Sequence, residues 1–389
     1  MATRWIMLGV LFVVRLSMGY QFQSVASVSS TLVADFGFSY AQVGTLIGLF
    51  LLPGIFISIP SGLMTRAVAN KNLLMLGAVA MITGGVLMAL SEGPSGLYTG
   101  RLITGVGGSI FNVILTKMVT EWFFEKEIVT ALAIILTAWP MGIAMGLVSQ
   151  GLIAETLGLE WVMYGTAGFA LFGLVLTAMF YRDAPVPADQ RVAPFRFGLP
   201  RRQFVHMALV SIAWALYNAS IILLVSFAPD ILIGDGYSEV EARSVTSLFM
   251  WVSLVSAPLG GRVIEVLGHM TATIIVMTAF SAVGMMAIAY GMATEVSFVV
   301  VGITLGVAVG ALMSLSSEAV SPENRGPGLG IFYTWYYIGM TISPMIAGWT
   351  KDMTGITSAP VMLAAGMLVV TIICVGLFRL LQKTWPITT

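Results

Sequence analysis

The chain has 389 residues, of which 58% are hydrophobic and 9% are charged, and its 18 Lys and Arg residues balance its 18 Asp and Glu residues. With a mean hydropathy of +0.96, this composition excludes a soluble domain and is typical of a polytopic helical membrane protein. A net charge of zero excludes a nucleic-acid partner bound through its phosphates. One cysteine and two widely separated histidines exclude a disulfide framework and a metal site. No nucleophile–base pair stands out, so we expect neither an enzyme nor a cofactor.

Twelve apolar runs are long enough to cross a bilayer, so we predict an all-α fold of twelve transmembrane helices. The runs are 5–32, 41–64, 72–92, 96–119, 128–152, 161–181, 204–230, 240–262, 270–292, 296–317, 327–349 and 359–381. The first run is too long for a signal peptide and lacks a small-residue cleavage site, so we expect it to remain as the first helix. The Pro- and Arg-rich segment 182–203 predicts a cytoplasmic linker between two six-helix bundles, 1–181 and 204–389.

The distribution of Lys and Arg residues predicts the orientation of these helices. With both termini in the cytoplasm, 14 of the 18 Lys and Arg residues lie on the cytoplasmic side, and only Arg243 and Lys351 lie outside. Arg15 and Arg101 fall within predicted helices. The compact loops favour a bacterial protein, so we expect the bacterial inner membrane.

The two halves of the chain resemble each other. Residues 38–66 align with residues 237–265, so that Ser39 stands opposite Ser238 and Gly62 opposite Gly261. Such a repeat predicts two bundles related by an axis along the membrane normal.

Together, the twelve runs, the division into six and six and the repeat resemble the major facilitator superfamily of secondary transporters over the whole chain. After the second helix this superfamily carries G-x-x-x-D-R-x-G-R-K. Here the segment reads GLMTRAVANK, in which Gly62 and Lys71 match and Arg66 replaces the Asp. The second-half counterpart GRVIEVLGH (261–269) has Glu265 at the acidic position. The resemblance implies that Gly62, Lys71 and Glu265 take part in gating.

Two further segments carry this resemblance. RLITGVGG (101–108) resembles the superfamily's R-x-x-x-G-x-G-G element, which implies a gating role for Arg101. Among the branches of the superfamily, the chain resembles the cyanate-permease-like group, which includes nitroimidazole exporters. The shared features are an Arg midway along the first helix, here Arg15, and the stretch GSIFNVILTKMV (108–119), with Asn112 near its centre.

Arg15 is the residue of the first helix that is most costly to place in lipid. It stands ten residues after Trp5, roughly 15 Å into a hydrocarbon core about 30 Å thick. A guanidinium at that depth costs at least ~2.5–3.5 kcal/mol and should therefore face protein or water. Arg15 either binds a substrate or is satisfied structurally by backbone carbonyls and a neighbouring amide.

The first and fourth helices supply further candidates. Tyr20 and Gln23 belong to a polar cluster just outward of Arg15, and a lipid-facing helix would not carry such a cluster. Arg101 and Asn112 share a helical face with Gly105 and Gly108. For that face, a stripe of small residues for close helix packing is the structural alternative. Asn112 is either a substrate contact or a hydrogen-bonding group between helices.

The seventh and eleventh helices supply candidates in the second half. His206 and Tyr217 share a face of the seventh helix, with Trp214 close by and Asn218 next to Tyr217. His206 lies near the cytoplasmic end and is either an interfacial residue or a proton relay. In the eleventh helix, the stretch FYTWYYIGM includes Tyr336 and Tyr337, which lie too deep for an interfacial belt and are predicted to line the site.

All 18 acidic residues fall in loops or near helix ends, so no carboxylate balances Arg15 within the membrane. We therefore predict a secondary transporter that moves a small anion, such as a carboxylate or cyanate, by alternating access at a central site. A coupling proton or a counter-substrate would drive it, and we expect a monomer in the lipid bilayer. The alternatives are an exporter of neutral aromatic or heterocyclic compounds and a transporter-like receptor.

Overall fold

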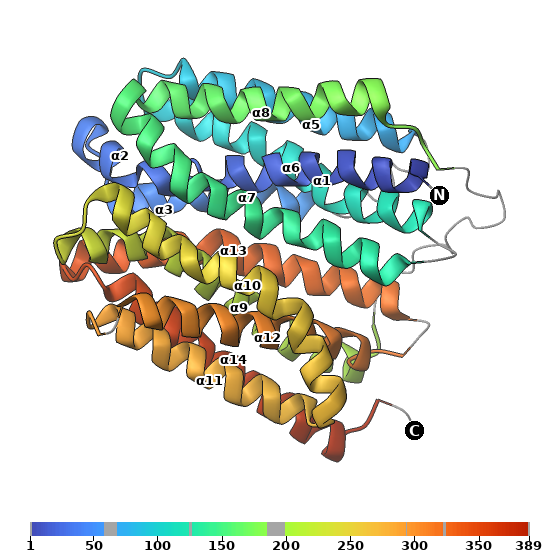
Figure 1. The fold of residues 1–389 in the computed structure, drawn as a ribbon. Coiled ribbons are helices and arrows are strands. Elements are labelled where there is room, and N and C mark those ends of the chain that lie inside the picture. The colour runs from blue at the N-terminus through green and yellow to red at the C-terminus, as the bar shows by residue number, and fades with distance from the viewer. Residues whose placement is uncertain are drawn as a thin grey trace. The chain divides into compact units, whose positions relative to one another are not determined.

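The computed structural model describes residues 2–57, 68–123, 127–184, 199–292, 294–321 and 324–387, and nearly all of them are helical (Figure 1). Eleven candidate membrane spans are found among the described residues on length and composition. The helix α13 (Arg325–Thr354), with 30 residues, is also long enough to cross a bilayer but is not among them, and its sequence includes the polar aromatic stretch TWYY. The predicted all-α membrane fold is confirmed.

Contacts divide the chain into two compact units. Unit 1 comprises Met1–Phe38 and Thr45–Val192, and unit 2 comprises Ser39–Gly44 and Ala193–Thr389. The helices of unit 1 are α1 (Ala2–Gln23), η1 (Ala26–Val28), α2 (Ser29–Phe36), α5 (Asn70–Ala89), α6 (Pro94–Trp122), α7 (Ile128–Leu157) and α8 (Leu159–Phe180). Helix α3 (Tyr40–Leu49) is shared, because its residues 40–44 belong to unit 2 and the rest to unit 1. The other helices of unit 2 are α9 (Arg201–Gly234), α10 (Glu239–Leu267), α11 (Met270–Ala289), α12 (Thr294–Glu318), α13 and α14 (Ala359–Thr384). Most of the predicted linker, 185–198, lies outside the described residues.

In unit 1, α1 packs against α7 and α8, and α5 packs against α6 and α8 (Figure 1). Two glycines allow the backbones of α1 and α7 to approach closely. A Cβ on Gly19 would lie 2.3 Å from the carbonyl oxygen of Trp139, and one on Gly142 would lie 2.3 Å from that of Leu16. Only glycine fits at such a crossing. These contacts fix the position of α1, which carries Arg15.

The first apolar run, 5–32, is not the single helix that its hydropathy predicts. Helix α1 ends at Gln23, and the short 3₁₀ helix η1 and helix α2 follow. Side-chain hydroxyls bind carbonyls at the break: Ser24 Oγ donates to Gln21 O at 2.8 Å, and Ser27 Oγ donates to Gly146 O of α7 at 3.4 Å. Serine hydroxyls compete in this way with helical hydrogen bonds.

In unit 2, α9 packs against α13 and α14, and α12 packs against α10 and α11. Helix α10 begins with a capping box in which Ser238 and Glu241 satisfy each other's backbone N–H groups. Residues 39–44 belong to this unit. The Asp352 carboxylate accepts the N–H groups of Tyr40 and Ala41 at 3.0 and 2.8 Å.

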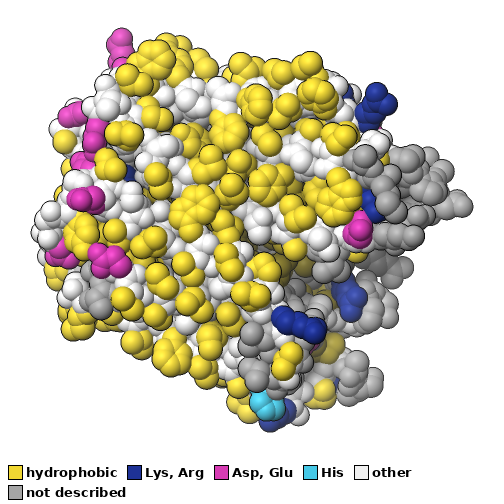
Figure 2. Space-filling view, in the orientation of Figure 1, with side chains coloured by type: hydrophobic (Ala, Val, Ile, Leu, Met, Phe, Trp, Pro, Cys, Tyr) yellow, Lys and Arg dark blue, Asp and Glu magenta, His cyan; other side chains and the backbone are white. Residues whose placement is uncertain are grey.

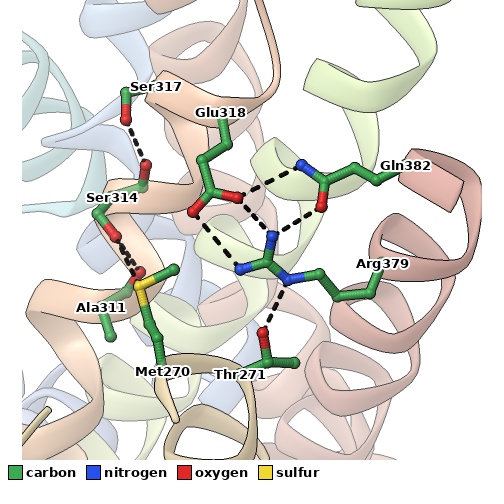
Figure 3. Close-up of polar contacts among 8 residues, drawn as sticks. All are labelled: Met270, Thr271, Ala311, Ser314, Ser317, Glu318, Arg379 and Gln382. Carbon is green, nitrogen blue, oxygen red and sulfur yellow. Dashed lines mark hydrogen bonds and ion pairs between the residues drawn. The ribbon is translucent and has the colours of Figure 1, made fainter. Parts of the chain in front are cut away.

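A polar cluster at one end of unit 2 joins three of its helices (Figure 3). Arg379 of α14 forms an ion pair with Glu318 at the end of α12, and its Nε donates to Thr271 Oγ1 of α11 at 2.8 Å. Gln382 accepts a further bond from Arg379 at 2.7 Å. The cluster therefore ties together the ends of α11, α12 and α14.

The outer surface matches a lipid environment. Figure 2 shows hydrophobic side chains over most of the visible helical surface, with charged side chains sparse among them. Large apolar side chains such as Phe172, Val283 and Leu380 are more than half exposed. Hydrocarbon is the solvent in which such a surface is stable.

Candidate functional site

Arg15 lies near the middle of α1, and only 8% of its surface is exposed. Its side chain is turned into the protein, as the cost of a guanidinium in lipid requires. Helices α6, α7 and α8 pack around α1 within unit 1. A guanidinium offers five N–H donors in a planar fork, a geometry that suits carboxylate groups.

The polar residues outward of Arg15 lie against α7. Tyr20 is 9% exposed, and its hydroxyl lies 3.0 Å from Ser149 Oγ. Its carbonyl oxygen accepts from Gln150 Nε2 at 2.7 Å. Gln23 is fully buried beside Gly146, where a Cβ would lie 2.9 Å from Gln23 Cβ. Neither amide atom of Gln23 has a hydrogen-bond partner among the described residues. Buried amides are nearly always hydrogen-bonded, so Gln23 can still bind a ligand.

Arg101 of α6 is fully buried and holds the broken end of α1. Its Nη1 donates to Gln21 O at 3.0 Å and its Nη2 to Phe22 O at 2.6 Å, while its Nε donates to Leu46 O of α3 at 3.0 Å. The guanidinium carbon also lies 4.8 Å from the ring centroid of Phe50. Because α1 stops at Gln23, its last carbonyls need donors. This geometry makes Arg101 a clamp on the end of α1.

The face that Arg101 shares with Asn112 is largely a packing face. A Cβ on Gly105 would lie 2.5 Å from Phe50 O, and one on Gly108 would lie 2.8 Å from the Phe50 ring. The small residues therefore let α6 approach the chain at the end of α3, which is the close-packing role predicted as the alternative to a binding face. Asn112, farther along α6, is partly exposed.

The predicted gating residues lie in different parts of the chain. Lys71, at the start of α5, donates from Nζ to the carbonyl oxygens of Ala178 and Tyr181 at 2.9 and 3.0 Å, which caps the end of α8. Gly62 lies outside the described residues, and Glu265 lies in α10 with a side chain that the structure does not describe.

In unit 2, α9 presents three of the predicted residues. Tyr217 is fully buried, and its hydroxyl donates to Leu305 O of α12. Asn218 is partly exposed, and its Nδ2 donates to Trp214 O at 2.8 Å. His206 is fully buried at the other end of the helix, with Nδ1 2.8 Å from Arg202 O. Since a carbonyl only accepts, Nδ1 carries the proton.

Helix α13 places a set of aromatic rings beside α9. The rings of Tyr336 and Tyr337 meet edge to face at 5.2 Å, and Tyr337 is 2% exposed while Tyr336 is partly exposed. Phe332, one turn before Tyr336, lies near-parallel to Trp214 of α9, with ring centroids 5.7 Å apart. The structure thus brings Trp214 into the aromatic set, although residue spacing alone placed it only near Tyr217.

Comparison with known proteins shows which family this architecture belongs to. The sequence profile of the Major Facilitator Superfamily matches residues 11–238 and 208–387. The chain is similar to a putative tartrate transporter of Agrobacterium vitis, with 24% identity over 90% of this chain and 84% of that one. It is also similar to the inner membrane transport protein YajR of Escherichia coli, at 24% identity over 86% and 75%. A hexuronate transporter of Bacillus subtilis matches at 22% identity over 90% and 89%.

Solved structures agree on the fold. A bacterial homologue of the human lysosomal transporter Spinster, in an inward-facing and occupied conformation, superposes with a TM-score of 0.78 at 16% identity, covering 99% of this chain and 98% of that chain. The same homologue in its unoccupied conformation gives a TM-score of 0.71. The branch within the family stays a prediction. The chain is an integral membrane protein and a transporter of a small molecule, not an enzyme, and it belongs to the Major Facilitator Superfamily.

Proposed function

We propose that this transporter moves a small organic anion, such as a carboxylate, by alternating access, and that Arg15 binds the anionic group. The observation that carries the proposal is the burial of Arg15 near the middle of α1. Every acidic residue that the structure describes lies outside the helices or within five residues of a helix end. A buried guanidinium near the middle of a membrane helix is costly, and binding of an anionic group is one function that accounts for keeping it there.

Two further observations support this proposal. The Gln23 amide lies two turns beyond Arg15 on α1, and its lack of a partner among the described residues suits a second contact to the substrate. The relatives named for their cargo are a putative tartrate transporter and a hexuronate transporter, and both cargoes are organic anions. Tyr20 and Asn112 in unit 1, and Tyr217, Asn218, Tyr336 and Tyr337 in unit 2, are the other substrate contacts that we propose.

The proposal extends to orientation and coupling. The excess of Lys and Arg in the loops on one side supports both termini in the cytoplasm. The compact loops support a location in the bacterial inner membrane. Arg101, Lys71, Gly62 and Glu265 act in gating in this proposal. Coupling comes from exchange, from the proton of the substrate itself or from His206, and the protein acts as a monomer.

Ligand-induced thermal stabilisation of the purified protein tests the anion assignment. A ligand at a hundred times its Kd stabilises the fold by ~2.7 kcal/mol. We expect tartrate, succinate or a hexuronate to stabilise the wild type and Arg15→Gln to lose this response. Arg201→Gln, at an exposed position, is the matched control and should respond like the wild type. An equal response of wild type and Arg15→Gln would contradict the proposal.

The aromatic rings of α9 and α13 favour a second candidate function, the export of a neutral aromatic or heterocyclic compound. In that case Arg15 would act only as a hydrogen-bond donor, and stacking would supply the affinity. Tyr336→Ala should then weaken binding more than Arg15→Gln does, and neutral heterocycles should stabilise both the wild type and Arg15→Gln. A larger loss of binding in Arg15→Gln than in Tyr336→Ala supports the anion proposal.

A further inference from the structure

In unit 2, a buried donor stands out among hydrogen-bonded neighbours. Trp214 of α9 is 8% exposed, and its Nε1 has no hydrogen-bond partner among the described residues. Around it, the Tyr217 hydroxyl donates to Leu305 O, Asn218 Nδ2 donates to Trp214 O at 2.8 Å, and Ser220 Oγ donates to Tyr217 O at 2.7 Å. An unsatisfied buried donor is costly and uncommon, and buried indoles usually have a partner.

The indole ring is held in place by its neighbours. It lies near-parallel to the ring of Tyr217, with centroids 6.3 Å apart and planes at 14°, and near-parallel to that of Phe332, at 5.7 Å and 27°. Tyr217 and Phe332 are themselves fully buried. Because these rings restrict rotation of the indole, the direction of its N–H is fixed by packing, which suits a group that selects a ligand.

We infer that the Trp214 N–H donates a hydrogen bond to a neutral oxygen of the transported molecule, and that the substrate is therefore an acid that carries a hydroxyl or carbonyl oxygen besides its carboxylate. This inference rests on the anion-transport proposal. Nε1 is covered by protein in the state that the structure describes, so the bond forms at the stage of transport that opens this part of unit 2.

The surroundings of Trp214 decide which oxygen it binds. The rings that pack against the indole belong to Tyr217 and Phe332, which are neutral. A carboxylate brought there would lose its hydration without gaining a cation, at a high cost, whereas a hydroxyl needs only one donor. The indole thus adds selectivity for oxygen-bearing acids.

The test compares two probes, tartrate and succinate, which share a carbon skeleton and differ in hydroxyl groups. Affinities of the purified full-length protein are measured by titration calorimetry for wild type, Trp214→Phe and Arg15→Gln. We expect Trp214→Phe to weaken tartrate binding about tenfold, the value of one hydrogen bond, and succinate binding less than about twofold. Arg15→Gln should weaken both acids alike.

Two controls separate the N–H group from the ring. Trp349→Phe on α13, at a position 55% exposed, should change neither affinity. Replacement of Trp214 by benzothienylalanine, which keeps the ring shape and substitutes sulfur for the N–H, should reproduce the selective loss of tartrate and also tests the role if the phenylalanine variant folds poorly.

Three results would overturn the inference, and they separate it from the broader proposal. If Trp214→Phe weakened the binding of both acids equally and benzothienylalanine restored both affinities, only the packing of the ring would matter. Unchanged affinities in Trp214→Phe would mean that water satisfies the donor. In both cases a loss of binding in Arg15→Gln still supports anion transport. If wild type binds neither acid, the inference falls, and the response to a hexuronate then decides the anion proposal by itself.

Discussion

Each unit holds a buried cation, and the two cations are stabilised by different kinds of partner. In unit 1, Arg101 is fully buried, and the acceptors of its three nitrogen atoms include the backbone carbonyls of Gln21, Phe22 and Leu46. In unit 2, the buried Lys351 forms an ion pair with Asp230. Backbone carbonyls can accept hydrogen bonds from a cation where a helix is interrupted, because they then lack an intrahelical partner. A side-chain carboxylate such as that of Asp230 can lie on an intact helix.

This difference determines how each unit responds to substitution. A carbonyl cluster has no counter-charge that can be removed by changing a side chain, so the arginine itself is the vulnerable partner. An ion pair has two vulnerable partners, and loss of either one leaves a buried charge. The comparison therefore predicts the largest effect at Asp230.

The Asp230→Asn substitution should destabilise the protein by ~3–5 kcal/mol, because Lys351 would keep its charge without its carboxylate partner. The side chains of Lys351 and Asp230 are 7% and 11% exposed. Lys351 Nζ also lies 3.4 Å from the ring centroid of Tyr40, a contact that offsets only part of the loss. Thermal unfolding of the purified protein measures the effect.

The double variant Asp230→Asn with Lys351→Met is the control for this prediction. It removes both charges, so most of the lost stability should return. A single variant that unfolds within a degree or two of the wild type would contradict the assignment of this pair as a buried, stabilising contact.

The Arg101→Lys substitution should cost about 2–3 kcal/mol although it preserves the charge. A lysine ammonium is a point donor and cannot serve carbonyls arranged for the planar guanidinium fork. Hydrogen exchange should rise most in peptides that span the break after Gln23. Arg201→Lys, at an exposed position, should change neither stability nor exchange. Uniformly increased exchange throughout unit 1 would argue against a clamp on α1.

The clamp also shows what the sequence could not reveal. The apolar runs predict the helices well, since hydropathy is a summed property of each run. The break after Gln23 depends on acceptors in other helices, such as Gly146 O, which no local pattern shows. The polar stretch around Ser24 and Ser27 was the available signal for it. Likewise, the spacing of Arg101 relative to other residues cannot show that its partners are backbone carbonyls.

In the candidate site, too, some features could be predicted from the sequence and others depend on packing between helices. The burial of Arg15 could be predicted, because the cost of a guanidinium in lipid depends on depth alone. The unpartnered N–H of Trp214 could not, because it depends on how α9 and α13 pack their rings. Lys71 was expected from the loop motif as a gating residue, and its contact with the end of α8 became visible only in three dimensions.

The Gly142→Ala substitution tests the backbone geometry that positions the clamp. Its Cβ would lie 2.3 Å from Leu16 O, so α1 and α7 would have to separate, at a cost of about 1–3 kcal/mol. Gly168→Ala is the matched control, since a Cβ at that position of α8 has no neighbour within 4 Å. It should leave thermal stability unchanged or raise it by up to ~1 kcal/mol, the helix propensity of alanine over glycine.

The smallest effect is expected at a more exposed ion pair of unit 2, between Arg379 and Glu318 (Figure 3). These side chains are 24% and 35% exposed, so water screens the pair, and Glu318→Gln should cost at most about 1 kcal/mol. Arg379 keeps its bonds to Thr271 and Gln382 in this variant. The difference between wild type and Glu318→Gln should shrink further in high salt, whereas the Asp230→Asn effect should persist, because buried pairs are screened less. Equal salt sensitivity at the two sites would mean that burial does not separate them.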